Sequence, residues 1–209
     1  MWLIAHRGDP KHAPENTLAS FRQAVARGAR AVEMDVRRCA DGVWVVLHDP
    51  ALGCSTDLPA SIPRVSEALA LCRSRRVQAF LDVKQSSYEE ELAQIVKRSG
   101  WLHQTVLLAG HVASLRRWRK LLPHRPLFRV TGFRVPITRE AIAQARRMKL
   151  AGFVGYRRWV NRQTIDWVHQ AGLRMIVWTV RTPADLKRYA RLGVDGMMSE
   201  IWPPPSRLI

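Results

Sequence analysis

The stretch RMIVWTVRTPADLKRYARLGVDGMM, from Arg174 to Met198, holds the unit that decides the fold. Apolar runs over 174–180 and 194–198 predict two buried strands. Between them, Thr182 is typical of a helix N-cap and Pro183 of a first helical position, which predicts a helix over 183–191. A strand, a helix and a strand in succession predict two parallel strands joined by a crossover.

The same alternation continues outward through the rest of the chain. Further strands are expected over residues 3–5, 31–36, 79–83, 106–109, 127–130 and 152–155. Further helices are expected over residues 16–27, 65–75, 89–98, 112–122, 137–149 and 161–170. This order predicts an α/β fold, a compact (β/α)8 TIM barrel formed by residues 1–209 as one domain. A doubly wound open sheet is the competing architecture.

One apolar run, over residues 43–47, has no place among these strands. It follows Asp41-Gly42, a strong hairpin signal, so residues 36–47 are expected to form a hairpin after the second strand. A two-residue turn at Asp41-Gly42 would place Asp35 opposite His48, and a longer loop would shift that register.

Composition narrows the class of protein. Thirty-four Lys and Arg against 17 Asp and Glu give a net charge of +17, which favours anionic partners. Three cysteines without a CxxC pair suggest neither a disulfide framework nor a zinc site. Apolar runs are too short for a membrane span, and the first residues do not read as a signal peptide. The expected location is the cytoplasm, with a peripheral membrane position as the alternative.

A barrel gathers its reactive side chains at the carboxyl ends of its strands. The chain has polar side chains at those positions: His6 and Arg7, Glu33 and Asp35, His48 and Asp49, Asp82 and Lys84, and Trp178. The sequence therefore predicts a site at this end of the barrel.

Three of these residues are acidic: Glu33, Asp35 and Asp82. Converging carboxylates repel one another unless a cation lies between them. Oxygen ligands select a hard divalent ion, Mg²⁺ or Ca²⁺. The alternative is that they are surface or salt-bridged acids.

Two histidines flank the predicted metal site. His6 and His48 can give a proton to a leaving group and take one from a nucleophile near neutral pH. Arg7 and Lys84 are suited to hold a phosphate, or to pair with the acids, and both can be true. The remaining histidines are expected in structural or surface roles: His12, His103, His111, His124 and His169.

These residues fall in motifs that resemble the glycerophosphodiester phosphodiesterase family, a member of the superfamily of phospholipase C-like phosphodiesterases. The motifs are His6-Arg7-Gly8, Pro14-Glu15-Asn16-Thr17, Glu33-Met34-Asp35-Val36, Asp41-Gly42, His48-Asp49, residues 62–69, Leu81-Asp82-Val83-Lys84, Val177-Trp178-Thr179-Val180 and Gly193-Val194-Asp195-Gly196. The likeness runs from about Ile4 to Ser199 and is specific only when the motifs are taken together.

The resemblance implies a barrel enzyme that hydrolyses glycerophosphodiesters to glycerol 3-phosphate and an alcohol with a divalent metal ion. The roles it implies are acid and base for His6 and His48, metal ligands for Glu33, Asp35 and Asp82, phosphate or substrate contacts for Arg7, Lys84 and Trp178, and an orienting role for Glu15. Asn16 is expected, from its position, to be the N-cap of the first helix.

The chain departs from the family pattern at several points. Asp82 stands where the family usually has Glu, which predicts a metal contact through water. Only residues 50–63 follow the His-Asp pair, so no sizeable inserted subdomain is expected to roof the site. Ala109-Gly110-His111 replaces a frequent Ser-Phe, and Ser199-Glu200 replaces a usual Thr-Asp.

Substrate and partners remain open at this point. The substrate is a small phosphodiester or a lysolipid, and the nucleophile is water or a neighbouring hydroxyl that would give a cyclic phosphate. Alternatives are a lysophospholipase D-like or lyase-type enzyme and a non-catalytic polyanion-binding barrel; no nucleic-acid partner is expected.

The high positive charge serves solubility, or it brings Arg116, Arg117, Arg119 and Lys120 to anionic lipid while Trp118 packs inward. The oligomeric state is not predicted.

Overall fold

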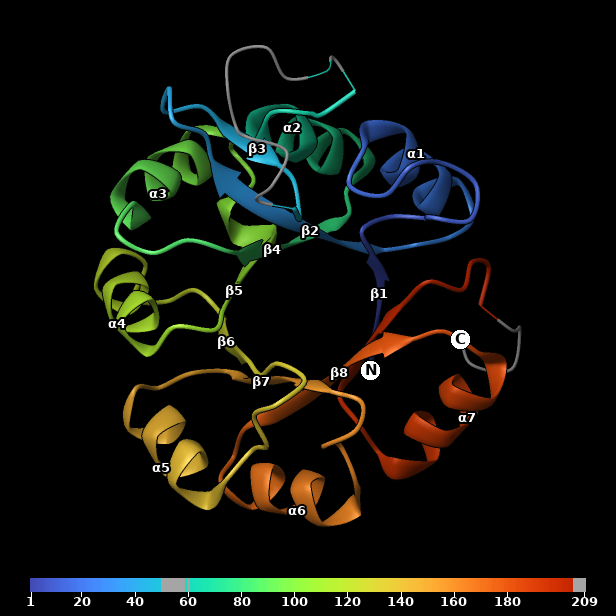
Figure 1. The fold of residues 1–209 in the computed structure, drawn as a ribbon, viewed down its shortest axis with the longest axis vertical. Coiled ribbons are helices and arrows are strands. Elements are labelled where there is room, and N and C mark those ends of the chain that lie inside the picture. Colours follow the sequence, from blue (N-terminus) through green and yellow to red (C-terminus); the bar gives the residue numbers. More distant parts are fainter. Residues whose placement is uncertain (50–58, 60, 205–209) are drawn as a thin grey trace.

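The computed structural model describes residues 1–49, 59 and 61–204, and its strands close into a ring (Figure 1). The ring consists of β1 (Trp2–His6), β2 (Ala31–Arg38), β4 (Gln78–Val83), β5 (Thr105–Ala109), β6 (Leu127–Val130), β7 (Gly152–Tyr156), β8 (Arg174–Val180) and β9 (Gly196–Ser199). Neighbouring strands pair in parallel, and β1 pairs with both β2 and β9. This closure confirms the (β/α)8 barrel and excludes the open sheet.

Helices surround the ring on its outside (Figure 1). They are α1 (Leu18–Ala26), α2 (Val65–Arg75), α3 (Glu89–Arg98), α4 (Val112–Leu121), α5 (Arg139–Arg147), α6 (Arg162–Gln170) and α7 (Pro183–Leu192), with a 3₁₀ turn, η2 (Leu102–Gln104), before β5. The Thr182 hydroxyl accepts the Asp185 N–H at the start of α7, as the sequence predicted. Among the described residues no helix has the length and apolar character that a membrane crossing requires.

The apolar core of the barrel has two layers, one inside the ring of strands and one between the strands and the helices. Side chains inside the ring fill it with a small cluster: Ile4, Ala31, Phe80, Val106, Leu108, Phe128, Val154, Ile176 and Met198. A larger layer joins the outer face of the strands to the helices and includes Trp118, which is fully buried as expected. Because the ring interior is packed rather than hollow, polar chemistry is confined to its ends.

The hairpin after β2 forms, but its register differs from the predicted one. β3 (Trp44–Val46) pairs antiparallel with β2, and the Leu47 N–H donates to the Asp35 carbonyl at 2.9 Å. The loop has three residues, because the Cys39 N–H donates to the Val43 carbonyl and Gly42 takes φ +89°. Asp35 is therefore opposite Leu47, and the prediction of His48 at that position is wrong by one residue.

Candidate active site

The carboxyl ends of the strands surround a cavity of about 340 Å³. Its lining includes the nine side chains to which the family resemblance gave a role, His6, Arg7, Glu15, Glu33, Asp35, His48, Asp82, Lys84 and Trp178, but not Asp49. The connection over residues 50–58 and 60, where the absence of a subdomain was predicted, lies outside the described residues.

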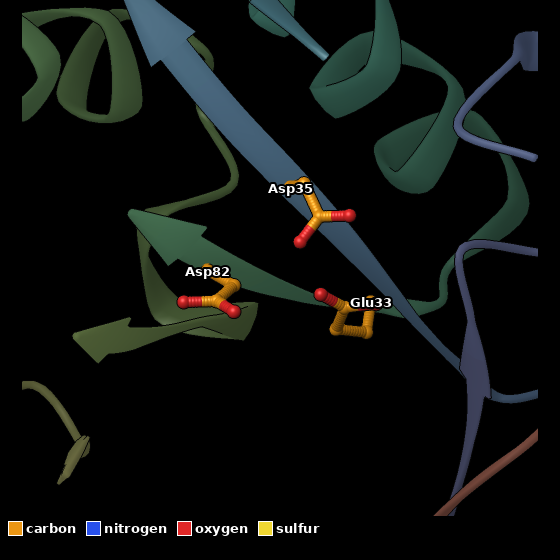
Figure 2. A group of neighbouring side chains, drawn as sticks. All are labelled: Glu33, Asp35 and Asp82. Carbon is orange, nitrogen blue, oxygen red and sulfur yellow. The ribbon is translucent and has the colours of Figure 1, made fainter. Parts of the chain in front are cut away.

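Three carboxylates meet on one side of this cavity (Figure 2). Asp35 of β2 and Asp82 of β4 are partners in the strand register, and Glu33 lies two residues before Asp35 on the same face of β2. One oxygen from each group lies within 4.8 Å of the others. Glu33 and Asp35 are buried, while the side chain of Asp82 keeps 14% of its exposure.

The electrostatics of this cluster call for a cation. Burial, together with the negative charges of Asp35 and Asp82, raises the pKa of Glu33 well above its usual range. Burial also raises the pKa of Asp82. Three oxygen donors that cannot all carry charge unaided, on adjacent rigid strands, fit a hard divalent ion. The three side chains therefore offer the ligand type and the spacing that such an ion needs.

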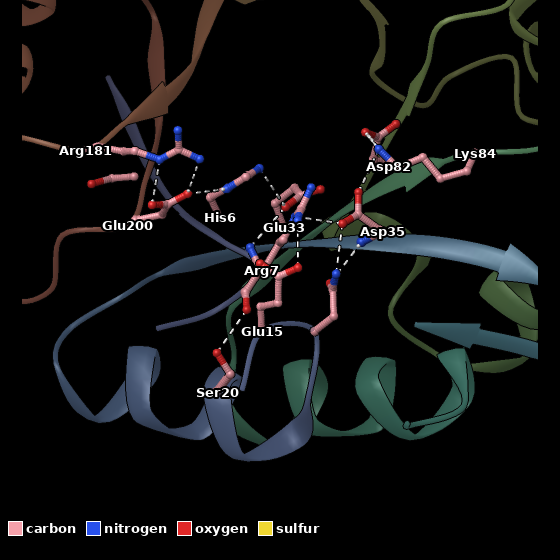
Figure 3. A network of polar contacts seen from close by, with 12 residues as sticks. His6, Arg7, Glu15, Ser20, Glu33, Asp35, Asp82, Lys84, Arg181 and Glu200 are labelled. Atoms are coloured by element: carbon pink, nitrogen blue, oxygen red, sulfur yellow. Dashed lines mark hydrogen bonds and ion pairs between the residues drawn. The ribbon is translucent and has the colours of Figure 1, made fainter. Parts of the chain in front are cut away.

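Two basic side chains already lie against the carboxylates (Figure 3). The Arg7 Nε is 2.9 Å from an Asp35 oxygen, and the Lys84 ammonium is 2.7 Å from the other Asp35 oxygen and pairs with Asp82. Burial opposes the charge of Lys84, but the nearby carboxylates outweigh it and raise its pKa. Glu15 accepts a hydrogen bond from Arg7 at 2.7 Å, which fits its predicted orienting role.

Asn16 has a different role from the predicted one. Thr17 is the N-cap of α1, and its side chain accepts the Ser20 N–H. Asn16, buried and at φ +58°, donates from Nδ2 to Asp35 at 2.8 Å and accepts the Asp35 N–H at 3.2 Å. The sequence signal for this role was that Asn16 and Thr17 both suit an N-cap. Only one of them can cap the helix, which leaves the other, Asn16, to bind the Asp35 carboxylate.

The histidines approach the cavity from different strands. His6 ends β1 and is buried, with Nε2 4.0 Å from Glu33 and Nδ1 3.4 Å from Glu200. His48 follows β3 and is exposed, and Arg37 donates to its carbonyl at 2.9 Å. Burial and the positive charges of Arg7 and Lys84 outweigh Asp35 and lower the pKa of His48.

Glu200 is a site residue whose role the sequence did not predict. It comes directly after β9, so its position at a strand end was the signal. Its carboxylate makes two contacts with Arg181, at 2.9 and 3.1 Å, and faces His6 (Figure 3). Burial pushes the pKa of Glu200 up, yet His6 and Arg181 hold it at about 2.

Two of the other histidines have ordinary structural partners, as expected. His12 lies 2.8 Å from Asp9, and His169 lies 2.8 Å from Asp195. Neither lines the cavity.

The opposite wall of the cavity is apolar and aromatic. Trp178 lies with its ring 6.5 Å from that of His6 and donates from Nε1 to the Thr131 carbonyl at 3.2 Å. Phe133 and Tyr156 pack against Trp178, each with ring centres 5.4 Å away. The cavity thus has a charged half and an apolar half.

The chain is similar to known proteins over nearly its whole length. The model of the "Glycerophosphoryl diester phosphodiesterase family" matches residues 6–90 and 75–200. A glycerophosphodiester phosphodiesterase of Caldanaerobacter subterraneus is 25% identical, over 95% of this chain and 93% of that protein.

Solved structures share the fold. An Oleispira antarctica phosphodiesterase, solved with the product sn-glycerol-3-phosphate, superposes with a TM-score of 0.84 at 21% identity, covering 96% of this chain and 93% of that one. The Thermotoga maritima glycerophosphodiester phosphodiesterase gives 0.77 at 17% identity, covering 95% and 93%.

Proposed function

The chain belongs to the glycerophosphoryl diester phosphodiesterase family, and we propose that it hydrolyses a glycerophosphodiester to glycerol 3-phosphate and an alcohol by acid–base catalysis between His6 and His48. The observation that carries the proposal is the meeting of both imidazoles and three carboxylates around one cavity.

Glu33, Asp35 and Asp82 would hold the divalent ion, Mg²⁺ or Ca²⁺. When bound, such an ion polarises a phosphoryl oxygen and stabilises negative charge in the transition state. Asp82 is one methylene shorter than Glu, and we expect it to be the weakest of the three ligands. Asn16, Arg7 and Lys84 fix the Asp35 carboxylate in place.

Arg7 and Lys84 would bind the phosphate oxygens. Both are positively charged, line the cavity and lie beside the carboxylate cluster. Glu15 holds the guanidinium from its outer side, so that Arg7 keeps one orientation.

The two imidazoles take different parts of the proton transfer. A lowered pKa leaves His48 unprotonated near neutral pH, which suits removal of a proton from the nucleophile. His6 then protonates the leaving alcohol. The Glu200 carboxylate faces Nδ1 of His6 and so orients Nε2 toward Glu33 and the cavity.

The test is a substrate panel of soluble glycerophosphodiesters and lysolipids assayed with Mg²⁺, Ca²⁺ and Mn²⁺, followed by phosphorus NMR. Turnover should require one of the ions, stop with a chelator, and fall at least about 100-fold in His6→Ala and His48→Ala. A cyclic phosphate as the end product would indicate a lyase instead. Near-normal turnover in both variants would contradict the acid–base assignment, and chelator-resistant polyanion binding without turnover would favour a binding module.

A further inference from the structure

The apolar half of the cavity continues outward to the rim. Its floor is formed by side chains from β5, β6, β7 and β9: Leu108, Val130, Val154 and Met198. Above them Tyr156 and Trp178 lead to Phe133, whose ring centre is 4.6 Å from that of Tyr156. Such a surface gains more from an alkyl or acyl group, which has a larger apolar area to bury, than from a polyol such as glycerol.

This aromatic wall does not suit a cationic headgroup. The three rings pack against one another with centres 4.6–5.4 Å apart, so they do not form an open cage around an ammonium group. Arg157 lines the same cavity and would repel a positive charge. The chemistry of the wall therefore points to an uncharged apolar group.

The wall ends in an exposed apolar tip. Phe133 keeps 61% and Val135 52% of their exposure, although both are large and hydrophobic. They share one loop, residues 131–136, between β6 and α5. The loop is held in place, because Trp159 donates from its indole N–H to the Phe133 carbonyl at 2.8 Å and the Val135 N–H donates to Gly132.

Basic side chains surround this tip. Arg134, Arg157 and Arg158 are all exposed, and the nearest acid to Arg157, Asp185, lies 4.0 Å away. An anionic membrane surface attracts each such residue by about 1 kcal/mol. Apolar side chains among arginines can enter the headgroup region of the same membrane.

We propose that the rim formed by residues 131–136, Arg157 and Arg158 docks on an anionic lipid surface, and that the substrate is a lysolipid-type phosphodiester drawn from that surface. The alkyl part would lie along Phe133 and Tyr156 while the phosphate reaches Arg7 and Lys84. The substrate class rests on the proposed function, whereas docking does not.

The rim is a better docking surface than α4. On α4, Arg117 pairs with Glu89 at 3.3 Å, and Arg119 donates to the carbonyls of Pro123 and Lys149. Two of the four basic side chains of α4 are thus engaged with the fold, and one of them has its charge paired. Moreover, α4 lies on the flank of the barrel rather than at the mouth (Figure 1).

The docking test is co-sedimentation with phosphatidylcholine vesicles, with and without phosphatidylserine. The protein should bind only the anionic vesicles, and Val135→Asp and Arg134→Glu should each weaken binding about 10-fold. Arg116→Glu on α4 is the charge-matched control and should bind normally. No binding by the parent protein, or loss in Arg116→Glu alone, overturns the rim as the docking surface.

The substrate test compares a soluble glycerophosphodiester with vesicle-borne lysophosphatidylglycerol. Val135 does not line the cavity, so Val135→Asp should keep soluble turnover and lose about 10-fold on the vesicles. Equal loss on both, or none on the vesicles, refutes the lipid assignment. If the parent protein turns over neither substrate, the proposed function fails, and the vesicle result still decides docking.

Discussion

At the scale of single residues, Asp35 depends on four contacts with its neighbours. It is almost fully buried, yet Lys84 and Arg7 outweigh the effect of burial and lower its pKa. The amide of Asn16 supplies two further hydrogen bonds. A buried carboxylate with these partners keeps its charge and one orientation, which a metal ligand needs.

Removing the Asn16 amide should therefore damage the site. In Asn16→Gly the φ of +58° causes no strain, so the loss beyond the usual entropic cost of a glycine reports the lost hydrogen bonds. We expect about 1–3 kcal/mol less stability and weaker metal binding. Urea unfolding and metal titration check this. Thr17→Gly, which removes the helix cap and the hydrogen bond to the Pro14 carbonyl but no contact with Asp35, should leave metal binding unchanged.

Glu200 should matter both for turnover and for acid stability. Losing an orienting partner costs a site roughly 10-fold, so Glu200→Gln should lower kcat by about that factor, with recovery in Glu200→Asp. Asp195→Asn is the matched control, because it removes a carboxylate from a histidine outside the cavity. An unchanged kcat in Glu200→Gln would show that Glu200 does not position His6.

The same variant gives a pH signature. A carboxyl held at a pKa of about 2, against an ordinary 4.5, stabilises the fold above pH 4.5 and loses that contribution as the pH falls toward 2. The difference in melting temperature between the parent protein and Glu200→Gln should be largest at neutral pH and shrink below pH 4.5. A difference that does not vary with pH would mean that the Glu200 charge is not the cause.

At the scale of elements, β2 and its hairpin determine where the chemistry lies. Strand ends were predictable, because the alternation of apolar runs and amphipathic helices sets both the order of the elements and the edge at which polar residues gather. The hairpin register was not predictable, since Asp41-Gly42 suits a two-residue and a three-residue loop alike. Likewise, sequence alone cannot tell whether Asn16 or Thr17 caps α1, as both side chains make good caps.

Strain in the loop between β2 and β3 should displace His48 and so lower turnover. Gly42→Ala forces a β-carbon into φ +89°, with the Arg38 guanidinium 3.1 Å away, and should cost about 1 kcal/mol. Because His48 follows β3 directly, turnover should fall as well. Gly172→Ala, at φ +72° after α6 with open space around it, carries similar strain far from the cavity. If Gly42→Ala and Gly172→Ala have equal activities, the geometry of the hairpin loop does not affect His48.

At the scale of the whole molecule, the barrel buries a cluster of carboxylates whose mutual repulsion lowers the stability of the fold. Glu33 lies on β2, which pairs with both β1 and β4, so repulsion around it acts on the closure of the ring. A raised carboxyl pKa means that stability falls as the pH rises above the ordinary value of 4.5. A bound divalent ion would reverse this cost, because it binds only the folded cluster.

Glu33→Gln separates the two effects. Without metal at pH 7, this variant should melt at least as high as the parent protein, by about 2–4 °C for each kcal/mol of repulsion removed. Added Mg²⁺ or Ca²⁺ should raise the melting temperature of the parent protein and barely move that of Glu33→Gln. At pH 4 the Glu33 carboxyl is protonated in the folded chain and mostly protonated in the unfolded chain, so the two proteins should melt alike. If the metal raises the melting temperature of the parent protein and of Glu33→Gln equally, the Glu33 carboxylate does not contribute to binding. The ion would then bind somewhere other than the carboxylate cluster of β2 and β4.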